Sequence, residues 1–221
     1  MNRFEAVVFD MDGVLVDSEP YHELAFHEVW DEMGYAENHD IHFPDFYGRS
    51  DKAVWEAFIQ KHQPPQPLEK LLAWKQSRLI GILQEKEPIF DGIPELVQRL
   101  SADHKLAVAS GSNHAVIRTV LGMQGLGQHF QFTVSAQDVG REKPAPDVYL
   151  KAAMQLGIAP SECCVIEDAV LGIQAGKAAG MTVVGITNSF PELELENAGA
   201  DFVVKDCREI GSIVFTNQDA L

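Results

Sequence analysis

The stretch AVVFDMDGVLVDS, residues 6–18, decides the fold. It starts with four apolar residues, Ala6–Phe9, and continues with Asp10, Asp12 and Gly13. A short apolar run without polar alternation is typical of a strand buried on both faces. Similar runs, with helical patterns between them, predict further strands at 106–109, 132–134, 163–166, 182–186 and 202–204. Strands that alternate with helices predict an α/β fold with a doubly wound parallel sheet, in which ligands bind at the carboxyl ends of the strands.

The segment between the first two strands is far longer than a single crossover helix requires, and most of it has helical periodicity. The second predicted helix follows Ser50, the third follows the break at 64–67, and the chain returns through Asp91-Gly92-Ile93-Pro94, which opens another helix over 94–100. We therefore expect an inserted helical domain at residues 17–87 and an α/β core formed by 1–16 and 88–221. The apolar face of the first inserted helix comprises His22, Ala25, Phe26, Val29, Trp30 and Met33.

Composition narrows the class of partner. The chain has 17 Lys and Arg against 33 Asp and Glu, a formal charge of −16, which argues against nucleic acid or an anionic membrane as a partner. Three cysteines without metal-site spacing predict buried reduced thiols. No stretch has the 18 or more apolar residues that a membrane span requires, and the N-terminus does not resemble a secretion signal, so we expect a cytoplasmic protein.

Acidic residues follow two of the predicted strands. Asp10 and Asp12 follow the first strand, and Glu167 and Asp168 follow the fourth. An EF-hand is excluded because Gly13 comes too early and Tyr21 stands where the bidentate glutamate would be. A buried carboxylate needs compensation, and if the two strands are neighbours the four carboxylates converge as hard oxygen ligands suited to Mg²⁺.

Two further segments carry groups suited to an anion. The second strand runs into Ser110-Gly111-Ser112-Asn113, which is either an ordinary helix N-cap or a phosphate cradle made of hydroxyl and backbone N–H donors. Lys143 lies in Glu-Lys-Pro-Ala-Pro-Asp, residues 142–147, where two prolines restrict the backbone. Most lysines are solvated surface charges, but one held in a stiff loop would neutralise an anionic cluster.

In order and position these segments resemble the four motifs of the haloacid-dehalogenase superfamily, in the subgroup of β-phosphoglucomutase-like phosphatases. The resemblance covers nearly the whole chain and implies a Rossmann-like core with the inserted helices as a cap. It implies a nucleophile at Asp10, a general acid/base at Asp12, and Ser110 and Lys143 as further catalytic groups. Other residues implied are Mg²⁺ ligands from Asp10, Asp12, Glu167 and Asp168, a phosphate site of Ser110, Gly111, Ser112 and Lys143, and substrate or cap residues His22, Gly48, Arg49 and Asn113.

The resemblance predicts a Mg²⁺-dependent phosphatase that hydrolyses small phosphorylated metabolites, in particular sugar phosphates, through an aspartyl-phosphate. The second aspartate, Asp12, favours phosphate esters over haloacids or phosphonates. The alternative is a hexose-phosphate mutase, but the mutase has a cap lysine before the glycine that matches Gly48, where this chain has Tyr47. A non-enzymatic acidic cation-binding module would explain the carboxylates but not Ser110 and Lys143. We expect a monomer or weak dimer.

Overall fold

The computed structural model describes residues 3–46 and 49–215 of the 221-residue chain. The chain divides into two compact units, Met1–Asp17 with Ile89–Leu221 and Ser18–Pro88, which are described separately below. The assignment of residues 1–16 and 88–221 to a catalytic core and of 17–87 to a cap stays a prediction. Within the described ranges, the helices are all too short or too polar to cross a membrane.

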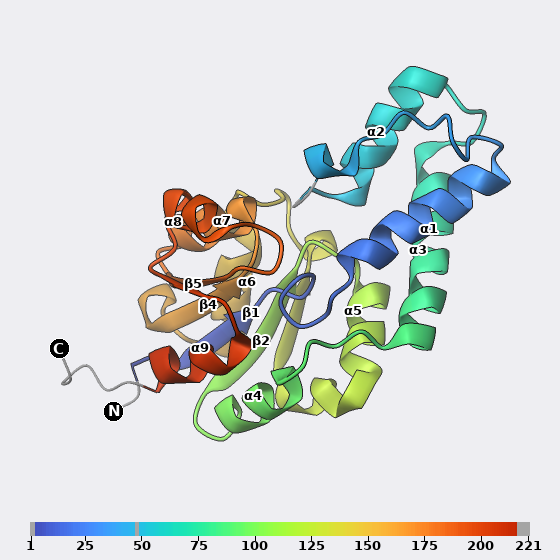
Figure 1. The fold of residues 1–221 in the computed structure, drawn as a ribbon. Coiled ribbons are helices and arrows are strands. Elements are labelled where there is room, and N and C mark those ends of the chain that lie inside the picture. Colours follow the sequence, from blue (N-terminus) through green and yellow to red (C-terminus); the bar gives the residue numbers. More distant parts are fainter. Residues whose placement is uncertain (1–2, 47–48, 216–221) are drawn as a thin grey trace. The chain divides into compact units, whose positions relative to one another are not determined.

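The first unit contains a six-stranded parallel sheet in the order β3-β2-β1-β4-β5-β6 (Figure 1). The central strands consist almost entirely of buried apolar residues, as the sequence runs predicted. The predicted α/β class and parallel sheet are therefore confirmed. The strands are β1 Ala6–Phe9, β2 Lys105–Ser110, β3 Phe132–Ser135, β4 Cys163–Glu167, β5 Thr182–Ile186 and β6 Phe202–Val204.

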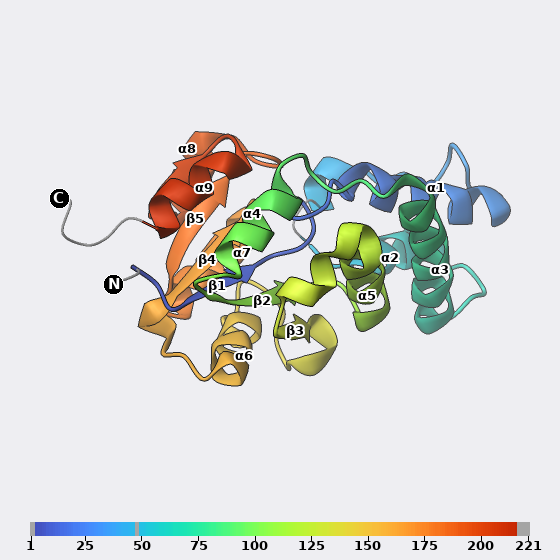
Figure 2. The same ribbon diagram turned by 90° about the horizontal axis from the view of Figure 1, so that it is seen from below.

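Helices cover both faces of this sheet, as doubly wound topology requires. Helices α6 and α7 bury apolar residues against one face, and Figure 2 shows α4 and α9 on the side opposite α6. All three cysteines are buried and free, which confirms the prediction of reduced core thiols. The helices of the unit are α4 Ile93–Leu100, α5 His114–Gly122, α6 Asp147–Leu156, α7 Val170–Ala178, α8 Glu192–Ala198 and α9 Cys207–Val214; the 3-10 segments are η2 Met123–His129, η3 Ala136–Asp138 and η4 Pro160–Glu162.

Strand register determines which side chains meet at the carboxyl edge of the sheet. In β1, Phe9 pairs with Val108 of β2 on one side and with Ile166 of β4 on the other. The residues that follow these positions therefore emerge at the same edge. Asp10 leaves β1 between Ser110, the last residue of β2, and Glu167, the last residue of β4.

The second unit is a small helical bundle with an aromatic core. Its elements are α1 Glu19–Glu32, η1 Phe43–Phe46, α2 Asp51–His62 and α3 Leu68–Lys86, so the three predicted helices are confirmed. Its core is built around Phe26, Trp30, Trp55 and Phe58, whose rings pack 5.2–5.8 Å apart between centroids.

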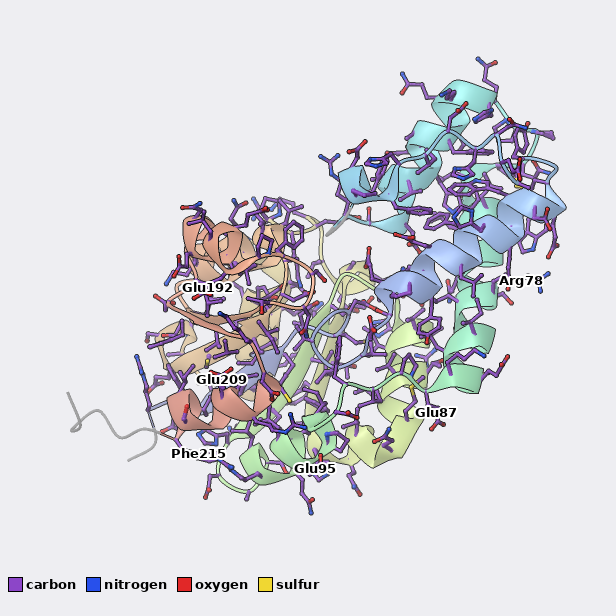
Figure 3. The ribbon with its side chains drawn as sticks, viewed as in Figure 1. Arg78, Glu87, Glu95, Glu192, Glu209 and Phe215 are labelled. Carbon is purple, nitrogen blue, oxygen red and sulfur yellow. The ribbon has the colours of Figure 1, made fainter. Side chains whose placement is uncertain are left out.

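One charged side chain lies inside this bundle. Lys75 occupies the inner face of α3 in line with Leu71 and Leu79, and its side chain is fully buried. By contrast, Arg78 projects from the outer surface of α3 (Figure 3) and pairs there with exposed Glu32. A buried ammonium needs a partner, and Asp51 at the start of α2 supplies it at 2.7 Å.

Candidate active site

Three carboxylates converge at the carboxyl edge of the sheet. Asp10, Glu167 and Asp168 are all buried and each offers an oxygen within 4.8 Å of the others. They come from the ends of the neighbouring strands β1 and β4, so the parallel register alone brings them together. Of the four carboxylates that the sequence predicts to converge at this edge, Asp10, Glu167 and Asp168 form this cluster, and Asp12 is described below.

Lys143 supplies positive charge to this carboxylate cluster. Its Nζ donates to Oδ1 of Asp10 at 2.6 Å and to Oε1 of Glu167 at 2.7 Å, and its side chain is only 13% exposed. The lysine arrives from the loop between η3 and α6. A buried ammonium between two buried carboxylates is held by charge-assisted hydrogen bonds in a fixed position.

Glu167 accepts hydrogen bonds on both of its oxygens. Oε1 accepts from Lys143 and from the Tyr149 hydroxyl at 2.8 Å, while Oε2 accepts from the backbone N–H groups of Asp168 and Ala169, each at 2.9 Å. A carboxylate has about four lone-pair positions, and these contacts use four. Glu167 therefore holds Lys143 through one oxygen and the backbone after β4 through the other.

The electrostatics of the site reflect crowding of negative charge. Burial raises the pKa of Asp10 to about 7, with Lys143 opposing the shift and Glu167 adding to it. Burial, followed by repulsion from Glu167 and Asp10, raises the pKa of Asp168 well above its usual range. Burial acts against the charge on Lys143, but Asp10 and Glu167 together raise its pKa well above normal. One lysine among these carboxylates leaves excess negative charge that a cation would balance.

The donor set fits a hard divalent cation. Carboxylate oxygens from Asp10 and Asp168 are the ligands that Mg²⁺ prefers. Burial, with repulsion between the carboxylates, raises the pKa of both groups, and a bound cation would oppose that shift. Within the ranges that the structure describes, this is the cluster of His, Cys, Asp or Glu side chains with metal-site geometry. The predicted ligand set of Asp10, Asp12, Glu167 and Asp168 stays a prediction.

Asp12 lies on the β2 side of the site. Its Oδ2 accepts from the Ser112 hydroxyl at 2.8 Å and from the Ser110 hydroxyl at 3.3 Å. Ser110 also accepts the backbone N–H of Ser112 at 2.9 Å, which closes a tight turn after β2. The two candidate acids from one loop thus have different partners, since Asp10 faces Lys143 and Asp12 faces two hydroxyl groups.

The turn after β2 is a helix N-cap, which was one of the two possibilities predicted from its sequence. Asn113 is the N-cap of α5, because its Oδ1 accepts from the N–H groups of Ala115 and Val116 at 3.0 and 3.1 Å. Gly111 is exposed, and among the described residues no heavy atom lies within 4 Å of where a Cβ would stand. The turn is therefore capped by Asn113 and open above Gly111, as a phosphate cradle would need.

Two glycines let the carboxylates pack closely. Gly13 has φ +77°, and a Cβ there would overlap the carboxylate of Asp168. A Cβ on Gly172, in the first turns of α7, would overlap the Glu167 carboxylate. Any side chain at these two positions would displace a carboxylate of the site.

The predicted cap residues lie in the second unit. His22 Nδ1 lies 2.8 Å from Lys75 Nζ and 3.4 Å from Oδ1 of Asp51, so this histidine belongs to the buried Lys75–Asp51 group. Arg49 is exposed, just before α2. Gly48 and Tyr47 lie outside the described residues.

Three residues at the site were missed by sequence reasoning. The buried Tyr149 of α6 donates to Glu167 and places its ring 4.9 Å from Lys143 Nζ. Asn188 donates to the Gly13 carbonyl at 2.7 Å, and Ser189 donates to Asp168. Tyr149 lies six positions after Lys143, on the apolar face of α6. A tyrosine at such a position is usually interpreted as a core residue. Asn188 and Ser189 lie two and three residues after the end of β5. Their position after an inner strand of the sheet was the available sequence signal.

The sheet and the groups at its carboxyl edge define an α/β enzyme core whose lysine, hydroxyls and carboxylates suit an anionic substrate. Comparison with known proteins specifies the class. Residues 4–180 match the family model of the haloacid dehalogenase-like hydrolases. The chain is 33% identical to the fructose-1-phosphate phosphatase YqaB of Escherichia coli, over 83% of this chain and 97% of that protein. It is 30% identical to the β-phosphoglucomutase of Bacillus subtilis, over 93% and 91% of the two chains.

A solved structure has the same fold. The crystal structure of CbbY from Rhodobacter sphaeroides in complex with phosphate aligns with a TM-score of 0.84 and 25% identity, over 94% of this chain and 96% of that one. The chain thus belongs to the haloacid dehalogenase-like hydrolase family and is similar to its β-phosphoglucomutase-like members. Family membership excludes the reading as a non-enzymatic cation-binding module.

Proposed function

We propose that this enzyme is a Mg²⁺-dependent phosphatase that hydrolyses small phosphorylated metabolites, with sugar phosphates as the substrate class. The observation that carries the proposal is Lys143, held between Asp10 and Glu167 beside Asp168 at the carboxyl edge of the sheet. Such an arrangement offers an oxygen nucleophile next to a fixed positive charge. The similar fructose-1-phosphate phosphatase supports the choice of sugar phosphates.

In the first step, a carboxylate oxygen of Asp10 forms a bond to phosphorus as the bond from phosphorus to the sugar oxygen breaks. The departing oxygen takes a proton from Asp12. Lys143 and the donors of Ser110 to Ser112 neutralise charge on the phosphoryl oxygens. When bound at Asp10 and Asp168, with Asp12 and Glu167 nearby, Mg²⁺ would supply further positive charge to those oxygens.

In the second step, water transfers a proton to Asp12 and its oxygen attacks the phosphorus of the aspartyl-phosphate. The bond between phosphorus and Asp10 breaks, which releases inorganic phosphate and restores the carboxylate. The helical unit, which we propose as the cap from residue 17 to residue 87, would select the substrate through residues such as His22 and Arg49.

Release of inorganic phosphate tests the proposal. The full chain, with Mg²⁺, should release phosphate from an aryl phosphate ester and then from a panel that includes fructose 1-phosphate, glucose 6-phosphate and phosphoglycolate. Asp10→Asn should retain the fold and fall below about 1% of wild-type turnover, a loss of about 3 kcal/mol or more in barrier lowering. Asp103→Asn, at an exposed carboxylate in the turn before β2, should leave turnover unchanged. Full activity in EDTA, or turnover by Asp10→Asn, would contradict the proposal.

A hexose-phosphate mutase remains the second candidate because of the similarity to β-phosphoglucomutase. A mutase must protect its aspartyl-phosphate from water and must retain a bisphosphate intermediate while that intermediate reorients in the site. Tyr47 replaces the expected cap lysine, and loss of a charge-assisted contact weakens retention by about 1.5–3 kcal/mol. Hexose 1-phosphate with Mg²⁺ and catalytic bisphosphate should therefore yield inorganic phosphate faster than hexose 6-phosphate, and the opposite ratio would favour the mutase.

A further inference from the structure

The turn after β5, residues 187–189, lies beside the carboxylate cluster and belongs to none of the predicted site motifs. It is fixed at both ends. The Thr187 N–H donates to the Val204 carbonyl of β6 at 3.1 Å, and Phe190 packs against the apolar core. Within the turn, the Asn188 N–H donates to the Ile186 carbonyl at 2.9 Å. The backbone that carries Asn188 and Ser189 is therefore anchored to the sheet.

Two polar side chains of this turn, those of Asn188 and Ser189, reach the loops that carry the carboxylates. Asn188 Nδ2 donates to the Gly13 carbonyl at 2.7 Å, and Ser189 Oγ donates to Oδ2 of Asp168. Gly13 belongs to the loop after β1 that presents Asp10, and the Asp168 carboxylate lies directly against the Gly13 Cα. The turn thus joins the loop after β1 to the acid that follows β4.

We propose that Ser189 and Asn188 are positioning residues for a divalent cation at Asp10 and Asp168, an inference that rests on the proposed function. Ser189 occupies Oδ2 of Asp168 and so sets the rotation of the carboxylate, which directs the other oxygen. Asn188 fixes the Gly13 carbonyl and with it the path of the loop after Asp10. Hydrogen-bond partners of ligand residues usually contribute 10–100-fold to metal affinity by this kind of orientation.

If the two side chains served only to hold the fold together, removing them would lower its stability and leave the metal affinity of the folded protein unchanged. Asn188 and Ser189 are both exposed residues, and in their absence water can hydrogen-bond to the Gly13 carbonyl and the Asp168 carboxylate. Removing either side chain should therefore change the stability of the fold little. If the turn orients the ligands, the change appears in metal affinity instead.

Direct metal binding to the full chain tests the inference, with Mn²⁺ followed by electron paramagnetic resonance and Mg²⁺ followed by calorimetry. Ser189→Ala should bind Mn²⁺ about tenfold more weakly than wild type, and Ser189→Thr, which keeps the hydroxyl, should restore most of the affinity. Asn188→Ala should weaken binding in the same direction. Ser212→Ala is the matched control, because Ser212 donates to the Glu209 carbonyl within α9. Melting temperatures should stay close to wild type for all four variants.

The outcomes separate the inference from the function on which it rests. If wild type binds Mn²⁺ and Ser189→Ala binds it equally well, the positioning role is wrong and the proposed phosphatase stands. The role is also overturned if Ser189→Ala loses affinity only in proportion to a loss of folded protein. If wild type binds neither metal, the proposed Mg²⁺ dependence fails first and the inference with it.

Discussion

Removing the charge of Asp51 should destabilise the helical unit severely, because Lys75 would remain buried without a counter-ion. The Lys75 side chain is 0% exposed, and its Nζ lies 2.7 and 2.8 Å from the two oxygens of Asp51. Its other contacts are His22 Nδ1 at 2.8 Å and the Phe26 ring, whose centroid is 4.8 Å away. Neither of these carries a negative charge.

The expected loss in the free energy of unfolding follows from this environment. Breaking a buried ion pair by removing one partner usually costs about 3–5 kcal/mol. The Asp51 side chain is 29% exposed, so water can approach Lys75 from that side, and we expect about 3 kcal/mol for Asp51→Asn, at the lower end of that range. Lys75→Met removes the buried charge itself and should cost less. The double variant should therefore be more stable than Asp51→Asn alone.

The assay uses the distribution of tryptophan. All three tryptophans, Trp30, Trp55 and Trp74, lie in the helical unit, so fluorescence during urea unfolding reports on that unit. Glu32→Gln is the matched control, since it breaks the exposed pair with Arg78 and should cost less than about 1 kcal/mol. The reasoning is refuted if Asp51→Asn costs no more than Glu32→Gln, or if the double variant is less stable than Asp51→Asn.

The same pair predicts a pH dependence. Burial acts against the charge of Asp51, but Lys75 holds the pKa of that carboxyl below its usual range. A carboxyl with a lowered pKa in the folded state stabilises the fold above its unfolded value of about 3.9, and that contribution is lost as the pH falls through the folded value. The difference between wild type and Asp51→Asn should therefore be full at neutral pH and shrink only below about pH 4.

Three further outcomes are expected. Gly172→Ala places a methyl group on the Glu167 carboxylate and should lower turnover at least tenfold, by about 1.4 kcal/mol or more, with tryptophan fluorescence unchanged. Tyr149→Phe removes one hydrogen bond to that carboxylate, and circular dichroism in urea should show about 1.5–3 kcal/mol of lost stability. His39 stacks on Trp30, and burial together with His27 lowers the pKa of His39. The helical unit should therefore lose stability as pH falls below about 6.5, and His39→Gln should flatten that loss in urea titrations at pH 8 and 5.5.

The strands could be predicted from the sequence because their signal is local. The run Ala6–Phe9 is apolar throughout, and Thr182–Ile186 is apolar after its first residue; the structure begins and ends these two strands at the same residues. Position at the end of a central strand then brought Asp10, Ser110 and Glu167 to one edge, since the order of parallel strands needs no side-chain detail. The argument required β1 to lie between β2 and β4, and the sheet has this order.

Residues whose role depends on distant partners could not be predicted in the same way. Lys75 stands on a helix among leucines, where a lysine normally extends into solvent, and the reason for its burial is Asp51, 24 positions earlier. Tyr149 has the spacing of a core residue, and only the 2.8 Å contact with Glu167 shows that its hydroxyl belongs to the site. Helical periodicity identifies the inner face of a helix but not the chemistry that the face meets.

For Asp12, the position in the site could be predicted from the sequence, but its hydrogen-bond partners could not. The sequence places it two residues after Asp10, which suggests that both carboxylates serve one cation. That shared role stays a prediction, and the structure adds that Oδ2 of Asp12 accepts from the hydroxyls of Ser112 and Ser110, while Asp10 accepts from Lys143. Asp10 thus lies beside the positive charge that attack on an anionic phosphoryl group requires, whereas Asp12 lies beside hydroxyl groups, which can both donate to and accept from a carboxyl as its proton moves. The different surroundings of Asp10 and Asp12 thus support the division of labour between nucleophile and acid/base that we propose.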